Sequence, residues 1–146
     1  HVPRFLEYMD VGTCTGCRAD AVVTTAQLRD RLAVRWPLRP LQSQYRGEVA
    51  ERHAFADGAG EVGFVSSVSA PFCGDCHRAR VSADGRLYTC LFAGEGHDLR
   101  PALAGGEAAL ASHAAALWSR RSDRYSEIRG NPQAPRKHIE MYLIGG

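Results

Sequence analysis

The sequence predicts a mixed α/β fold, and three observations lead to this class. Apolar and polar residues alternate over residues 4–9, with aromatics among them, which indicates a strand. Helical patterns occur at residues 24–36 and 107–120. Between the two helices lie two pairs of strand-like runs, each interrupted by turn residues. Strands and helices interleaved in one chain favour the α/β class over an all-helical or all-strand fold.

The bulk composition restricts the classes of function. The chain has 146 residues, enough for a hydrophobic core, and 45% of them are apolar. The net charge of +2 is too small to indicate a nucleic-acid partner. No stretch is long and apolar enough to span a bilayer, and no secretory signal is visible. We therefore expect a cytoplasmic protein without a nucleic-acid or membrane partner.

The first predicted strand and helix occupy residues 1–36. Gly12 and Gly16 end the strand pattern. The helix begins with a capping box formed by Thr24 and Gln27. Its apolar face is made by residues spaced at i, i+4 and i+8 (Leu28, Leu32, Trp36). The prolines that follow cannot continue a helix, so we expect it to end at residue 36.

The middle of the chain predicts a hairpin, and the second half predicts two helical segments. Residues 48–55 and 62–68 are strand-like, and the Gly-containing stretch between them fits a longer hairpin loop. Residues 97–103 suggest a short helical segment. Residues 107–120 are alanine-rich and end near three arginines, which complement the helix dipole. The tail from residue 129 has no periodicity.

A second hairpin is predicted around the Asp84-Gly85 dipeptide, a strong signal for a two-residue turn. In that register Ala83 pairs with Arg86. If the ladder continues, Ala79 faces Cys90, and Cys90 lies about three residues from the Cys76 end of the strand. The hairpin therefore predicts that the cysteine-bearing segments lie close together.

Three cysteines in this region form a candidate metal site. Five cysteines, an odd number, in a chain without a secretory signal favour metal binding over a disulfide framework. Cys73 and Cys76 have the spacing at which two thiolates reach one metal, and Cys90 adds a third. His77 or His97 could complete a zinc site. Alternatively, three cysteines could hold a [4Fe–4S] cluster with one open iron, or the thiols could bind no metal. The spacing does not choose among these three.

Two further pairs of residues are candidates for function. Arg78 and Arg80 are two apart at the start of a strand, so their guanidinium groups face the same side and suit a phosphate. A solvated charged strand face is the alternative. Cys14 and Cys17 form a second CxxC, which could join the other thiols or consist of two free thiols.

The stretch from residue 71 to 92, "PFCGDCHRARVSADGRLYTCLF", resembles the C-terminal cluster motif of the molybdenum cofactor biosynthesis protein A family, the radical SAM GTP 3′,8-cyclases. The pattern FCxxC, RxR, DG and CLF is present in full. "RFLEYMDVG", "LWSRRSDRYSEIR" and the terminal "IGG" also look like this family. The resemblance covers nearly the whole chain and is far more specific than a bare CxxC.

The resemblance implies a place for this chain in a larger fold. It would be the C-terminal part of an incomplete (β/α) radical SAM barrel with a cluster-binding extension. Residues 1–36 would supply the last barrel strand and its flanking helix. Residues 37–146 would form the iron–sulfur and GTP-binding region with its Gly-Gly tail.

The resemblance also implies roles for named residues. Cys73, Cys76 and Cys90 match the ligands of a [4Fe–4S] cluster whose open iron binds the guanine base. Arg78 and Arg80 match GTP-binding positions. In the family, S-adenosylmethionine on a second [4Fe–4S] cluster provides the radical that starts cyclisation of GTP, a lyase reaction of molybdopterin biosynthesis.

Three more positions match the family's active site. Met9 matches a residue that lines the S-adenosylmethionine site. Gly145 and Gly146 match a tail that reaches into the catalytic centre. The resemblance implies three partners: GTP, an N-terminal radical SAM portion and, for the next reaction, cyclic pyranopterin monophosphate synthase. A homodimer is the assembly to test.

The sequence departs from the family pattern in three respects. No CxxxCxxC occurs in the 146 residues, and the chain starts with His1, so we expect a fragment that is inactive alone. The CxxC of Cys14 and Cys17 has no family role, and His77 stands where Asn or Thr is more usual. The alternative function is therefore a stand-alone, zinc-stabilised binding module with Cys₃His or Cys₄ ligation.

Overall fold

The computed structural model describes residues 1–9, 22–128 and 139–144. The chain divides into two compact units, the first holding described residues up to 76 and the second those from 77 onward. Each unit has its own sheet, and both sheets are open, with a linear strand order and no barrel closure among the described strands. The mixed α/β class is therefore confirmed.

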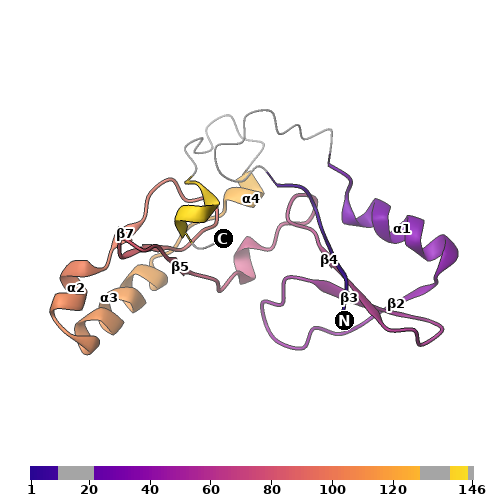
Figure 1. Cartoon of the computed structure of the whole chain (residues 1–146), viewed down its shortest axis with the longest axis horizontal. Coiled ribbons are helices and arrows are strands. Elements are labelled where there is room, and N and C mark those ends of the chain that lie inside the picture. Colours follow the sequence, from indigo (N-terminus) through magenta and orange to yellow (C-terminus); the bar gives the residue numbers. More distant parts are fainter. Residues whose placement is uncertain (10–21, 129–138, 145–146) are drawn as a thin grey trace. The chain divides into compact units, whose positions relative to one another are not determined.

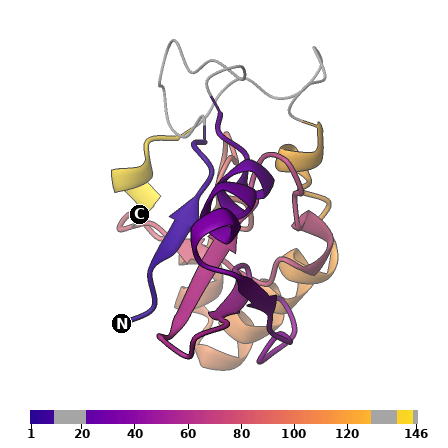
Figure 2. The ribbon, with the colours of Figure 1, turned by 90° about the vertical axis from the view of Figure 1, so that its right-hand side faces the viewer.

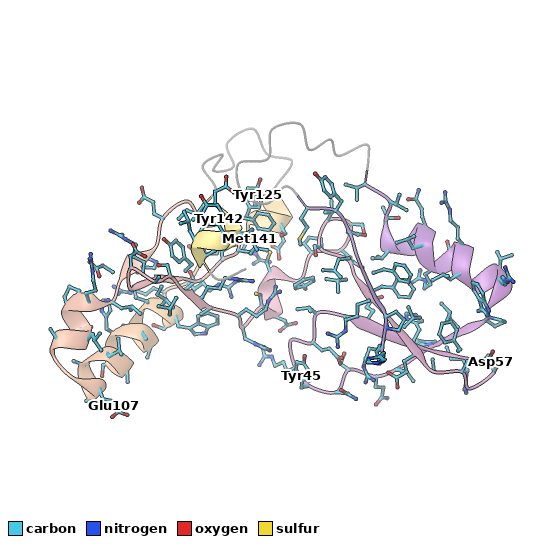
Figure 3. The ribbon with its side chains drawn as sticks, viewed as in Figure 1. Tyr45, Asp57, Glu107, Tyr125, Met141 and Tyr142 are labelled. Atoms are coloured by element: carbon cyan, nitrogen blue, oxygen red, sulfur yellow. The ribbon has the colours of Figure 1, made fainter. Side chains whose placement is uncertain are left out.

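The first unit is built on a sheet of four strands in the order β1-β4-β3-β2 (Figure 1). The bounds of the strands are Arg4–Leu6 for β1, Leu38–Pro40 for β2, Glu51–Phe55 for β3 and Glu61–Val65 for β4. β1 runs parallel to β4, beside which Figure 2 shows it in indigo, and the other neighbours are antiparallel. The predicted hairpin is confirmed as β3 and β4, and Asp57 lies in the loop that joins them (Figure 3).

The core of the first unit is centred on Phe64 of β4, which is 1% exposed. The ring of Phe5 stacks on it at a centroid distance of 5.8 Å. The His53 ring meets it edge-on at 5.5 Å, and Val62 is also buried. Offset and edge-to-face aromatic pairs of this kind add to the stabilisation from burial alone. These contacts tie the edge strand β1 to the centre of the sheet.

Helix α1 (Thr25–Arg35) has the capping box that the sequence predicts. The Gln27 N–H donates to the Thr24 hydroxyl at 3.2 Å, and the Thr24 N–H donates to the Gln27 side chain at 3.0 Å. The helix ends at the C-cap Trp36, as expected. The short strand β2 that follows was not predicted. It contains Pro40, and proline is tolerated there because β2 is an edge strand.

The second unit contains a sheet of three strands in the order β5-β6-β7. The strands are β5 (Arg80–Val81), β6 (Arg86–Tyr88) and β7 (His97–Asp98). The β5–β6 hairpin is confirmed, but the predicted register was wrong by one residue. Arg80 pairs with Tyr88, and Ser82 and Arg86 close the loop, with the Ser82 N–H donating to the Arg86 carbonyl at 2.9 Å.

The cause of the shifted register is a three-residue loop in place of the two-residue turn. Gly85 has a φ of 78°, the left-handed conformation expected at the last position of such a loop. The Gly85 N–H donates to the Ser82 carbonyl at 2.9 Å. The Ser82 hydroxyl also donates to Asp84 and accepts from the Arg86 N–H, which stabilises this loop further.

Helical segments complete the second unit. They are α2 (Arg100–Ala104), α3 (Glu107–Ser119), α4 (Tyr125–Ile128) and the 3₁₀ turn η3 (Met141–Ile144). The helix predicted at residues 107–120 is confirmed as α3, and α2 packs on it. The helical segment predicted at residues 97–103 is confirmed only from Arg100, because His97 and Asp98 form strand β7. Arg120 donates to the carbonyl of Ala116 at 3.1 Å, so it satisfies one of the last carbonyls of α3. No helix within the described ranges has the length and apolar character needed to cross a membrane.

Candidate functional site

The cysteine pair lies on one tight turn of the first unit. The 3₁₀ turn η2 (Cys73–Asp75) begins at the first cysteine, and Cys76 caps its end. The Cys76 N–H donates to the Cys73 carbonyl at 3.3 Å. A Cβ built on Gly74 would meet nothing within 4 Å, so this position is open. Both thiols are half-buried, and they lie three residues apart on one turn, which is the spacing of CxxC metal sites.

A cavity of about 300 Å³ lies beside this turn. It is lined by Ser43, Tyr45, Arg46, Gly47, Glu48, Phe72 and Asp75. The guanidinium of Arg46 lies 3.4 Å from the carboxylate of Asp75, and both side chains are largely exposed. Such an exposed ion pair contributes little to stability.

Glu7 binds the segment that leads into the cysteine turn, through the N–H groups of Val68 and Ser69. The sequence pattern did not indicate it as a functional residue. Its side chain is 2% exposed, yet it carries a carboxylate. Burial raises the pKa of this carboxyl, but hydrogen bonds from the Ser69 hydroxyl and from the backbone of Thr25, Ser69 and Val68 outweigh it, and the pKa is lowered overall. The fold therefore stabilises the charged form, and this contribution is lost in acid as the carboxylate becomes protonated.

The two arginines lie at the start of the β5–β6 hairpin in the second unit. Arg80 is the first residue of β5 and Arg78 precedes it by two, and both side chains are half-buried. The observed pairs are Arg80 with Tyr88 and Val81 with Leu87, and β6 ends at Tyr88, before Cys90. The prediction that Ala79 faces Cys90 was therefore wrong, because the ladder begins at Arg80 and ends at Tyr88.

Cys90 lies between two anchored neighbours. Thr89 is buried and its hydroxyl donates to Asp123. Phe92 is buried and stacks on Tyr125 of α4, labelled in Figure 3, with ring centroids 4.6 Å apart. The segment that carries Cys90 is therefore held from both sides.

The sulfur of Cys90 accepts a hydrogen bond from the Phe92 N–H at 3.4 Å. Backbone N–H groups directed at sulfur stabilise thiolate and tune the potential of iron–sulfur clusters. Within its own unit, the Cys90 sulfur thus has the kind of backbone donor that suits a cluster-ligating thiolate. Cys73 and Cys76 belong to the first unit and Cys90 to the second. Within the described residues, no group of three or more His, Cys, Asp or Glu side chains is gathered to hold a metal ion.

The remaining candidates are distributed as follows. Met9 is half-buried and is the last described residue after β1. His77 and His97 are both exposed. The predictions for Cys14, Cys17, Gly145 and Gly146 fall outside the described residues.

Comparison with known proteins identifies the family. A family model described as "Molybdenum Cofactor Synthesis C" matches residues 2–127. A GTP 3′,8-cyclase of Xanthomonas campestris pv. campestris is 69% identical over 146 residues, covering 100% of this chain and 43% of the relative. The GTP 3′,8-cyclase of Synechococcus sp. strain CC9605 is 50% identical over 143 residues, 98% of this chain and 41% of the relative.

A third relative, the GTP 3′,8-cyclase of Acidothermus cellulolyticus, is 50% identical over 135 residues, 88% of this chain and 37% of the relative. The chain thus spans less than half the length of these relatives. The resemblance noted in the sequence is confirmed: the chain belongs to the molybdenum cofactor synthesis C family.

Proposed function

We propose that this chain is the GTP-binding portion of a GTP 3′,8-cyclase. Cys73, Cys76 and Cys90 hold a [4Fe–4S] cluster through three thiolates, and the fourth iron stays open to the substrate. When bound, such an iron supplies a Lewis-acid position for an atom of the guanine base. The observation that carries the proposal is the N–H···S bond at Cys90, on a segment anchored by its neighbours.

The chain's own residues have two tasks in this proposal. The thiolates fix the cluster, with the Cys90 thiolate stabilised by the Phe92 N–H. Arg78 and Arg80 bind the phosphate groups of GTP through charge-assisted hydrogen bonds, which orients the nucleotide. The place of the arginines supports this role: Arg80 begins β5 and Arg78 precedes it by two residues, just after the turn that carries Cys73 and Cys76.

The wider roles implied by the family are also part of the proposal. Residues 1–36 are the last strand and flanking helix of an incomplete barrel, and the order β1 then α1 is that of a β/α unit. Met9 contacts S-adenosylmethionine, and Gly145 and Gly146 enter the catalytic centre. We also include a cytoplasmic location in the proposal. The second [4Fe–4S] cluster would belong to a separate radical SAM portion of the enzyme, and a pyranopterin synthase would act on the product downstream.

Anaerobic reconstitution with iron and sulfide tests the proposal. The purified chain should take up iron and sulfide in equal amounts and develop the absorption of a [4Fe–4S] cluster. Uptake of stoichiometric zinc with no iron would instead support the zinc-stabilised module with Cys₃His or Cys₄ ligation.

Arg78→Ala should weaken GTP binding and leave the iron content unchanged. A hydrogen bond to a charged group contributes about 1.5–3 kcal/mol, so we expect a roughly ten- to hundredfold rise in Kd. Calorimetric titration of the reconstituted chain measures it. Arg39→Ala on the exposed strand β2 is the control and should bind GTP as the parent does. Equal affinity for the Arg78→Ala and control variants would show that Arg78 is only a surface charge.

A further inference from the structure

We propose that Glu7 is a positioning residue for the cluster turn, holding the segment 66–69 so that Cys73 and Cys76 are presented in a fixed place. This role rests on the proposed function, because it takes the turn to be a cluster-ligand turn. All the residues involved lie in the first unit, so every contact in the argument is a contact within that unit.

The carboxylate of Glu7 receives donors from two separate segments. Its Oε1 atom accepts from the Thr25 N–H at 2.8 Å and from the Ser69 hydroxyl. Its Oε2 atom accepts from the backbone N–H groups of Val68, at 2.7 Å, and Ser69, at 2.8 Å. One buried side chain at the end of β1 thereby joins the start of α1 to the segment that follows β4.

Only a carboxylate satisfies this arrangement. Glutamine has one acceptor oxygen, so its NH₂ group would have to face at least one N–H donor. Thr25 is the first residue of α1, where the positive end of the helix dipole favours an anion. A buried charge with all its donors in place is rigid, and it becomes costly once a donor is missing. The network therefore specifies one position for Ser69.

Because Ser69 is close to Cys73 along the chain, the position of Ser69 restricts the position of the cysteine turn. Only residues 70–72 separate Ser69 from Cys73, and Pro71 has a fixed φ. The Ala70 N–H donates back to the Ser66 carbonyl at 3.2 Å, so the segment has little freedom to move. On the other side, the hydroxyls of Ser66 and Thr25 are 2.6 Å apart, which closes the same network. A shift of Ser69 would therefore displace the first thiol.

The test compares three variants of the 146-residue chain after anaerobic reconstitution. Glu7→Gln should lower the bound iron several-fold and alter the electron paramagnetic resonance spectrum of the reduced cluster that remains. Ser69→Ala removes the hydroxyl donor and keeps the two backbone bonds to Oε2, so its spectrum should change in the same direction but less. Val62→Ala, a core truncation in β4 away from this network, should lower Tm yet keep the parent's iron content and spectrum.

Two outcomes would overturn the positioning role. One is a Glu7→Gln or Ser69→Ala spectrum identical to that of the parent chain. The other is a Val62→Ala variant that loses as much iron as Glu7→Gln at the same fall in Tm, since general destabilisation would then explain both. Should Glu7→Gln not fold, the Ser69→Ala spectrum decides. Failure of the parent chain itself to bind iron is a separate result, which overturns the proposed function together with this role.

Discussion

Replacing Cys90 with alanine should reduce the bound iron to background after reconstitution. Two thiolates remain in that variant, too few for the proposed three-cysteine ligation. The Phe92 N–H would also lose the sulfur that it bonds in the parent chain. Because metal binding and folding are coupled, the hairpin that carries Cys90 should in addition unfold at a lower temperature than in the reconstituted parent. Iron analysis and thermal unfolding followed by circular dichroism measure the two effects.

Cys14→Ala is the matched control for this experiment. The same residue type is exchanged, at a position to which the family gives no ligand role. Its iron content should equal that of the parent chain. A full cluster content in Cys90→Ala would refute the assignment of Cys90 as a ligand. Loss of iron in Cys14→Ala would instead favour a metal site that also includes Cys14 and Cys17.

Gly96→Ala should destabilise the second unit strongly. A Cβ at this position would lie 2.5 Å from the ring of Tyr88, and that ring is 5% exposed, so it has little room to move. Overpacking of this kind costs about 1–3 kcal/mol. The Gly96 carbonyl also accepts from Arg86 at 3.1 Å, so a backbone shift would disturb the same sheet. We expect Tm to fall by about 4–8 °C per kcal/mol in a unit of this size.

Gly74→Ala is the control for the packing argument, measured on the metal-free chain. Its added Cβ would meet nothing within 4 Å, so its effect on stability should stay within about 0.5 kcal/mol. A Tm for Gly96→Ala equal to that of the parent would mean that Tyr88 can move aside.

The local features of the fold were predictable because they depend on neighbouring residues. The capping box of Thr24 and Gln27 is one example, since both partners lie within one helical turn. The β3–β4 hairpin is another. The register of β5 and β6 was not predictable from Asp84-Gly85 alone, because the Ser82 hydroxyl selects the longer loop through bonds that the dipeptide does not reveal.

In the candidate site, too, local features were predictable from the sequence and long-range contacts were not. The CxxC turn follows from spacing. The two arginines were predicted at the start of one strand, but β5 begins at Arg80, so Arg78 lies before it. Glu7 could not be found from sequence, because in a strand pattern it occupies an ordinary polar position. Its donors Val68 and Ser69 lie more than sixty residues away, at separations of 61 and 62. The predicted boundary between residues 36 and 37, which separates the barrel part from the cluster-binding region, stays a prediction. It describes roles within a longer enzyme.

The place of β1 in its sheet has a practical consequence. Among the described strands, β1 lies at the edge of the first sheet, and it presents Phe5 and Leu6, which are 37% and 57% exposed. An apolar edge strand is a template on which another chain can add a strand. We therefore expect the isolated chain to self-associate as its concentration rises, and a lysine in place of Leu6 to improve its solubility.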